Sequence, residues 1–303
     1  MEDLKNAVVK ALLYFDIFSF PLRQEEVHRF CGVKTRVQEV NAALQELLAE
    51  QRAWVYEGYF MARPRAEWVA KREENHKISS AMMKEAVRNA RLISQFPFVR
   101  AVSISGSLSK YSADENADID YFIIARSGRL WICRSLLHLF KKLTFLFGRQ
   151  NGFCMNYFLD EEELELKDKN YYTALESITV IPLFGASTQR AFYEANRWVR
   201  AYFPNHDPVL ALNGRISERH SRLKLWMEWL FSGKWGISVN HALRRLTVWW
   251  WRRKFQRSGF PMQYFDHDLR ATPGESKNHP NDHQRVILAA FRKRIRAVEE
   301  RGR

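Results

Sequence analysis

Two neighbouring stretches of the sequence decide the fold: residues 102–110, VSISGSLSK, and residues 116–124, NADIDYFII. The first is an apolar run that predicts a strand ending in a Gly-Ser pair. Gly106 lets the backbone turn there and come close to a phosphate. In the second, Asp118 and Asp120 begin another predicted strand, whose two-residue period points both carboxylates to one face. The glycine turn and the paired acids together predict a phosphoryl-transfer site.

The spacing of the two acids suits a divalent metal ion. Side chains two residues apart on a strand lie about 7 Å from each other. Carboxylates at that separation can hold Mg²⁺ or Mn²⁺, or a pair of such ions, against the phosphates of a nucleotide. A helix that begins near Ser107 would add free N–H groups that favour the same phosphates.

The pattern resembles that of the DNA polymerase β-type nucleotidyltransferase superfamily, in which a hydrophobic strand, Gly-Ser and a loop precede Asp-x-Asp on the next strand. The likeness is to the small stand-alone members and covers about residues 98–160. It implies transfer of a nucleoside monophosphate from a nucleoside triphosphate to an acceptor, with release of pyrophosphate. The implied binding residues are Gly106 and Ser107 for the triphosphate, with Lys110 as a neutralising cation, and Asp118 and Asp120 for the metal.

The superfamily usually supplies a third acid from a later strand, and two residues compete for that place. The predicted strand at residues 153–159 carries Asn156, whose amide can offer an oxygen to metal or nucleotide but cannot take a proton near neutral pH. Asp160 shares the strand parity of Asn156 and follows the strand end, so it is the candidate catalytic acid. Glu163, Glu165 and Glu176 are further acids, but nothing in their spacing selects one of them. The third position therefore stays open.

The order of the surrounding elements predicts a small mixed-sheet α/β domain over residues 97–185. Strands are expected at 99–104 and 119–125, a helix at 128–147 and a third strand at 153–159. From residue 170 onward the pattern is almost wholly helical.

The sequence ahead of that domain predicts a winged-helix-like module, residues 1–63, followed by a connector helix, residues 64–96. Helical periodicity at residues 2–16, 21–31 and 35–51 is followed by two short strands around a Glu-Gly turn at 54–61. The exposed positions of the third helix carry several acids, which a phosphate backbone would repel. The module is therefore expected to have a structural or protein-contact role, and sequence-specific DNA binding is disfavoured.

The charge of the chain is concentrated at its C-terminal end. The net charge of +14 divides into +2 for residues 1–210 and +12 for residues 211–303, and six of the ten tryptophans lie between residues 226 and 251. Residues 186–303 are predicted to form a basic, Trp-rich helical region. Its tryptophans could fill a helical core, stack on RNA bases, or sit with Lys and Arg at an anionic membrane surface. An anionic acceptor, whether RNA, lipid-linked or a glycan, fits this region.

The loop at residues 273–283 offers three further polar candidates. His279 and His283 lack a cysteine or third partner nearby, so a solvated loop is expected there and not a metal site. Lys277 could reach a triphosphate from this loop.

Three widely spaced cysteines and the absence of a long uncharged apolar stretch predict a cytoplasmic protein with no transmembrane segment. The favoured function is a metal-dependent nucleotidyltransferase. The alternatives are a weak or inactive nucleotide-binding regulator or scaffold of the same fold, and a peripheral membrane or RNA-binding protein that acts through the basic C-terminal region.

Overall fold

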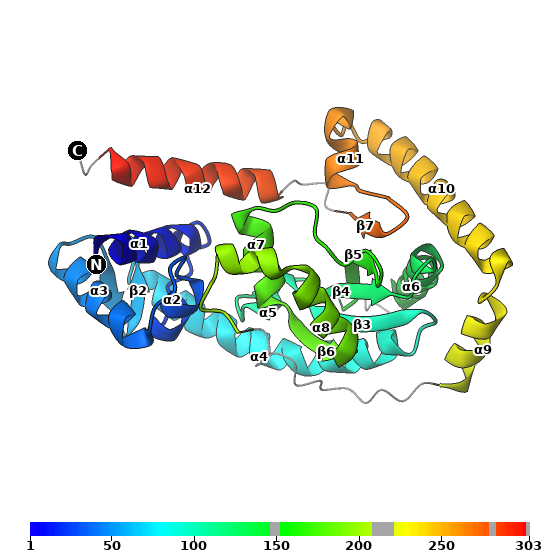
Figure 1. Ribbon diagram of the computed structural model, residues 1–303, viewed down its shortest axis with the longest axis horizontal. Helices are drawn as coiled ribbons and strands as arrows, with labels where there is room; N and C mark the ends of the chain where they lie inside the picture. Colours follow the sequence, from blue (N-terminus) through cyan, green and yellow to red (C-terminus); the bar gives the residue numbers. More distant parts are fainter. Residues whose placement is uncertain (146–151, 208–220, 279–282, 301–303) are drawn as a thin grey trace.

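The computed structural model describes residues 1–145, 152–207, 221–278 and 283–300. The fold is mixed α/β, as predicted, with a five-stranded sheet and a separate two-stranded hairpin. Figure 1 shows an elongated molecule with the sheet near its middle, the N-terminal helices at one end and the helices α9 and α10 at the other. No helix in the described part of the chain combines the length and the apolar character needed to cross a membrane.

The central sheet has the strand order β6-β3-β4-β5-β7. Strands β4 and β5 are parallel and the other neighbouring pairs are antiparallel. Helix α6, Leu130–Phe145, makes the crossover that a parallel pair requires. The strands are β3, Val99–Ile104; β4, Asp120–Ala125; β5, Cys154–Asp160; β6, Ile181–Phe184; and β7, Glu275–Lys277.

Both faces of the sheet are covered, which explains why β3 and β4 are apolar almost throughout. On one face, Val102 and Ile104 pack with α6 and with α4, Glu67–Ser94, and the hydroxyl of Tyr121 donates to the Ala86 carbonyl of α4 at 3.1 Å. On the other face, Ala101 packs against α8, Ala186–Ala195. Burial on both faces fixes the register that aligns the ends of β3 and β4.

The N-terminal module has the predicted three helices and hairpin. They are α1, Glu2–Asp16; α2, Gln24–Phe30; α3, Val37–Ala49; β1, Trp54–Tyr56; and β2, Tyr59–Met61. Its core continues into α7, Tyr171–Thr179, η1, Arg197–Ala201, and α12, His283–Glu299. The Tyr14 ring lies 4.9 Å from that of Tyr171 and 5.1 Å from that of Phe291, measured between centroids. The module is thus packed against the rest of the chain through shared aromatic residues.

The chain beyond residue 186 does not form the single helical region that the sequence predicts. Its described part contains β7, which extends the sheet, and α12, which returns to pack on α1 and α7 at the far end of the molecule (Figure 1). The remaining elements stay at the other end. They are α9, Arg222–Leu230; α10, Lys234–Arg257; η3, Met262–Tyr264; and α11, Phe265–Asp268.

Candidate functional site

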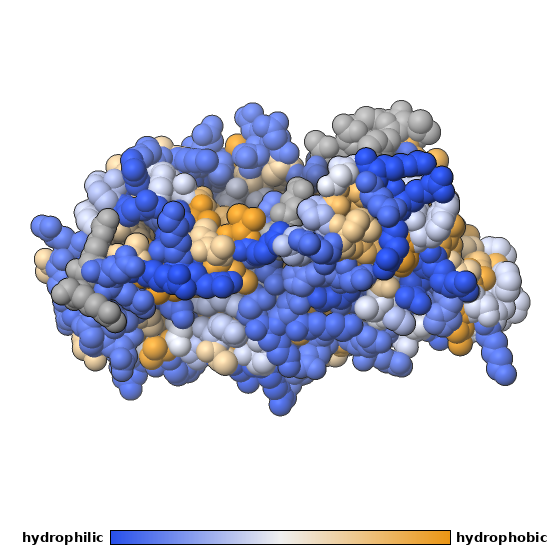
Figure 2. All heavy atoms as spheres, turned by 90° about the horizontal axis from the view of Figure 1, so that it is seen from above, coloured by the Kyte–Doolittle hydropathy of each residue, from blue (hydrophilic) through white to orange (hydrophobic). Residues whose placement is uncertain are grey.

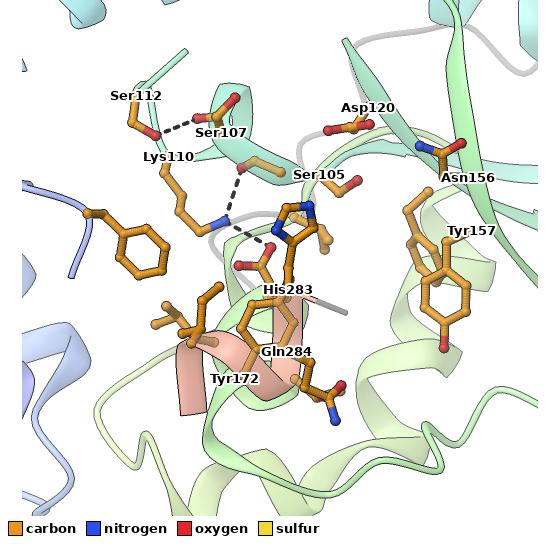
Figure 3. Close-up of a pocket in the computed structure, with 18 of the residues that line it drawn as sticks. Ser105, Ser107, Lys110, Ser112, Asp120, Asn156, Tyr157, Tyr172, His283 and Gln284 are labelled. Atoms are coloured by element: carbon orange, nitrogen blue, oxygen red, sulfur yellow. Dashed lines mark hydrogen bonds and ion pairs between the residues drawn. The ribbon is translucent and has the colours of Figure 1, made fainter. Parts of the chain in front are cut away.

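A cavity of about 840 Å³ lies where the sheet, α7, the start of α12 and the N-terminal module meet (Figure 3). It is lined by six of the seven residues that the sequence predicts at the Gly-Ser turn, the paired acids and the third position. These are Gly106, Ser107, Lys110, Asp118, Asp120 and Asn156.

Gly106 brings the turn after β3 into contact with the acidic start of β4. The Ser105 amide donates to the Asp120 carbonyl at 3.0 Å, and Gly106 follows with a φ of +67°, which favours glycine. A Cβ at this position would lie 2.5 Å from Asp120 Oδ2. Only a glycine therefore lets the turn and the carboxylate come this close. The turn continues as the single helical turn α5, Gly106–Ser109.

The two predicted acids differ in their surroundings. Asp118 is exposed just ahead of β4, whereas Asp120, the first residue of the strand, is half-buried. Burial is the main reason that the pKa of Asp120 is raised to about 6, and the negative charges of Asp118 and Glu176 raise it further. A hydrogen bond with the Cys154 thiol and the charge of Lys110 act in the opposite direction. Asp120 is thus a desolvated carboxylate that a cation would stabilise.

The donor set fits a Mg²⁺ or Mn²⁺ ion that takes its other ligands from phosphate and water. Mg²⁺ is commonly held by one or two carboxylates together with substrate phosphates. Asp118 and Asp120 provide two such groups at the cavity. Because Gly106 has no Cβ, the space beside the Asp120 carboxylate stays open. The described residues contain no group of three or more His, Cys, Asp or Glu side chains that could hold a metal ion by themselves. The arrangement suits an ion that arrives with a nucleotide better than a permanently bound one.

Lys110 lies in the cavity but its charge is already engaged. Its ammonium group donates to the Gly106 carbonyl at 3.0 Å and to Glu176 Oε2 at 2.9 Å (Figure 3). The position of the ammonium group is therefore fixed between the glycine turn and α7. Glu176 is the acid that the sequence could not select, because only the packing of α7 beside the sheet brings it to this place.

Asn156, one of the two competitors for the third position, lines the cavity. Its amide Nδ2 donates to the Cys154 sulfur at 2.9 Å, and its backbone carbonyl accepts from the Asn278 amide at 3.0 Å. Cys154 in turn is hydrogen-bonded to Asp120. Asn156 and Asp120 thus belong to one polar group at the same end of β4 and β5.

Asp160 lies at the other end of these strands, so the predicted catalytic role does not fit its position. Asp120 pairs with Cys154, whereas Asp160 pairs with Ala125, a separation of about 16 Å along the strands. The Asp160 carboxylate is buried, and it accepts the backbone amides of Gly128 at 2.8 Å and Glu162 at 3.0 Å. It stabilises the turn into α6 and takes no part in the cavity.

The C-terminal loop reaches the cavity through Lys277 and the first residues of α12. Lys277 donates to Asp168 Oδ2 at 3.2 Å, within an ion-pair network that includes Arg270 and the buried Glu275. His283, which the sequence places in a solvated loop, instead begins α12 and faces the cavity (Figure 3). His279 lies outside the described residues.

The N-terminal module contributes aromatic residues to the lining of the cavity. Phe15, Phe18 and Phe20 line it, together with Tyr172 of α7 and Ile287 of α12. No local pattern in the sequence connects these residues to the acids, since they meet only through long-range packing. The module therefore has a visible structural role, which is to close one side of the cavity.

Comparisons of the chain with protein-family models, with curated proteins and with solved structures found no match.

Proposed function

We propose that the protein is a Mg²⁺- or Mn²⁺-dependent nucleotidyltransferase of the DNA polymerase β type. The observation that carries this proposal is the contact between Gly106 and Asp120, inside a cavity that Asp118 and Ser107 also line. A glycine turn for phosphate and paired carboxylates for a metal are the two parts that phosphoryl transfer needs, and they lie together here.

The reaction moves a nucleoside monophosphate to an acceptor hydroxyl. The acceptor oxygen forms a bond to the α-phosphorus, the bond from that phosphorus to the bridging oxygen breaks, and pyrophosphate leaves. The acceptor proton passes to a carboxylate that lines the cavity. When bound, the metal ion supplies positive charge that stabilises the phosphates and the leaving group.

The residues of the chain bind and orient the reactants. Asp118 and Asp120 hold the cation, and the turn at Gly106 with the Ser107 hydroxyl faces the phosphates. Lys110 adds a positive charge whose place is set by the ion pair with Glu176. We assign Glu176 as a positioning residue, because it acts through Lys110.

The acceptor would occupy the apolar side of the cavity. About 840 Å³ lies in the range of small-molecule sites, so a nucleotide and a small acceptor group can share it. The aromatic wall of Phe15, Phe18 and Tyr172 offers stacking or apolar contact to that group. A lipid-linked group, a glycan or the unpaired end of an RNA meets this requirement.

Release of pyrophosphate tests the proposal. The purified protein is incubated with each of the four ribonucleoside triphosphates, Mg²⁺ and candidate acceptors of these three classes, with EDTA in parallel. We expect pyrophosphate release with at least one combination of nucleotide and acceptor. EDTA should abolish this release, and the Asp118→Asn/Asp120→Asn variant should lack it. Absence of both turnover and metal-dependent nucleotide binding would contradict the proposal.

A second candidate function, a nucleotide-binding regulator without catalysis, is favoured by one observation. The position that usually carries a third acid is Asn156, whose amide cannot accept a proton. This candidate predicts Mg²⁺-dependent nucleotide binding with no pyrophosphate release for any acceptor. For either function we propose a reducing compartment such as the cytoplasm, supported by free, buried thiols at Cys31, Cys133 and Cys154.

A further inference from the structure

In helix α9 the usual orientation of a surface helix is reversed: a lysine faces the protein and the large apolar side chains face solvent. Lys224 is only 1% exposed, and its ammonium group donates to the carbonyls of Ser94 at 2.8 Å and Val99 at 3.0 Å. Glu228 accepts from Arg100 at 2.9 Å. The charged side chains of α9 therefore fasten it to the protein, while its large apolar side chains point to solvent: Leu223, Leu225, Trp226, Trp229 and Leu230.

Helix α10 continues this arrangement. Trp251 and Phe255 are buried against α11 and its surroundings, and Trp235, Leu246 and Trp249 form a stripe on the opposite side at helical spacing. The exposed fraction is 72% for Trp229 and 64% for Trp235. We call the exposed residues of these helices the α9–α10 surface, and its apolar members are Leu223, Leu225, Trp226, Trp229, Leu230, Trp235, Ile237, Leu246, Trp249 and Trp250.

Exposed apolar residues gather here more than elsewhere on the described chain. Figure 2 shows hydrophobic residues at the end of the molecule where α9 and α10 lie. Leu139 and Leu143 of the neighbouring helix α6 are also exposed. A patch of this kind marks an interaction site, because burying it against a partner removes its contact with water.

The same surface is strongly basic. Residues 221–257 contain nine Lys or Arg and a single acid, Glu228, which Arg100 already neutralises. Lys234, Arg245 and Arg257 have no ion pair with any other described residue. An occupant of this surface must therefore combine an apolar interior with negative charge at its boundary.

We infer that the α9–α10 surface docks the protein on an anionic lipid bilayer, with both helices lying in the interface and not crossing it. Tryptophan and leucine side chains enter the boundary between headgroups and acyl chains, and the cations meet the anionic headgroups. The buried Lys224 and the partly buried Glu228 hold α9 in place while its apolar side faces outward.

A nucleic acid fits this surface less well. Arg253 lies over the Trp249 ring at 5.6 Å, and both Lys142 and Lys254 lie near the Trp250 ring at 5.9 and 5.4 Å. Cations thus compete for the ring faces on which bases would stack. The leucines among the rings offer no stacking surface to a base. A lipid interface accepts aliphatic and aromatic side chains alike.

A second copy of the chain also fits poorly. A two-fold contact would bring the same basic surface of both copies together. The described residues of α9 and α10 offer no unpaired acid to meet those cations, because Glu228 is engaged. Like-charge repulsion would oppose such a dimer.

Vesicle flotation tests the inference without any nucleotide, so its outcome is separate from that of the proposed function. The full chain is mixed with vesicles of phosphatidylcholine alone or with about one third phosphatidylglycerol, at low and high salt. We expect flotation with the anionic vesicles, weakened by salt, together with a blue shift of tryptophan fluorescence.

Two variants separate the apolar and the basic contributions. Trp229→Ser/Trp249→Ser and Arg245→Glu/Arg253→Glu should each lower binding by about tenfold or more, with unchanged far-UV circular dichroism. Val286→Ser, an equally exposed apolar residue on α12 at the other end of the molecule, is the matched control and should bind as the wild type does. The inference is overturned if anionic vesicles do not float the wild type, if single-stranded RNA but not vesicles is bound, or if the tryptophan variant only dissociates a dimer.

Discussion

The cavity and the α9–α10 surface both contain cations and aromatic side chains, but they arrange them differently. In the cavity, two lysines form ion pairs with acids: Lys110 with Glu176, and Lys277 with Asp168. On the α9–α10 surface, apolar side chains face solvent and most cations lack an acidic partner. These arrangements support our two proposals, that the cavity binds a small charged molecule and that the α9–α10 surface binds an extended anionic surface.

The difference changes the meaning of the net charge of +14. The acids that the proposed chemistry needs lie in the nearly neutral first part of the chain, and the positive excess lies mostly in residues 211–303. Among the described residues of that part that line the cavity, Lys277 alone contributes to the excess. We therefore relate the net charge to the proposed docking surface and not to the proposed reaction.

Loss of the half-buried carboxylate should have the largest effect. Asp120→Asn removes a charge that the cation requires, and we expect turnover to fall by at least about 1,000-fold with little change in folding. The control is Glu115→Gln, an exposed acid of the same loop that does not line the cavity. Pyrophosphate release measures both. Equal activity in the two variants would mean that Asp120 is not needed for catalysis.

A methyl group at Gly106 should move the carboxylate without removing it. Gly106→Ala places its Cβ 2.5 Å from Asp120 Oδ2, and we expect turnover to fall by about 100-fold. Gly128→Ala is the matched control, because it has a similar positive φ of +64° but nothing within 4 Å of the added carbon. Both variants should lose about 1–3 kcal/mol of stability in thermal unfolding. A similar loss of activity in both would mean that backbone strain alone is responsible.

Substitutions of Glu176, which lines the cavity, and of Asp160, which does not, test which of the two acids serves the proposed reaction. Glu176→Gln should lower turnover about tenfold and raise the KM for the nucleotide, because Lys110 loses its charged partner. Asp160→Asn should change turnover less than about twofold, while weakening the turn at Gly128 by about 1 kcal/mol. The reverse order of effects on turnover would restore Asp160 as the catalytic acid.

The smallest effect concerns the anchor of α9. Burial is the main reason that the pKa of Lys224 is lowered to about 8; Arg100 also lowers it, while Glu228 and Cys133 raise it. Above pH 8 the folded protein loses this proton while the unfolded chain keeps it, so stability should rise with pH. Relative to Lys224→Met, the wild type should gain about 1 kcal/mol between pH 8 and pH 9. Urea unfolding at both pH values measures this, and parallel curves would contradict it.

The sequence predicts what depends on neighbours in the chain and misses what depends on distant packing. The glycine turn, the presence of Asp118 and Asp120 at the cavity and the three N-terminal helices follow from local pattern, although Asp118 lies ahead of β4 and not on it. Parity gives the face of a strand but not which of its ends meets the cavity, so it leaves Asp160 as a candidate that the structure then places at the wrong end. Glu176 and the wall at Phe15 reach the cavity only through the shared packing of α1, α7 and α12. Strand β7, with the sequence Glu-Ser-Lys, has no apolar pattern from which to predict a strand.

Metal binding that depends on nucleotide tests the roles of Asp118 and Asp120 most directly. Mn²⁺ binding is followed by electron paramagnetic resonance, with and without a non-hydrolysable nucleoside triphosphate, for the wild type and Asp118→Asn/Asp120→Asn. We predict that the wild type binds Mn²⁺ tightly only with the nucleotide, and that the folded double variant does not. Unchanged nucleotide-dependent binding of Mn²⁺ by the double variant would contradict the account.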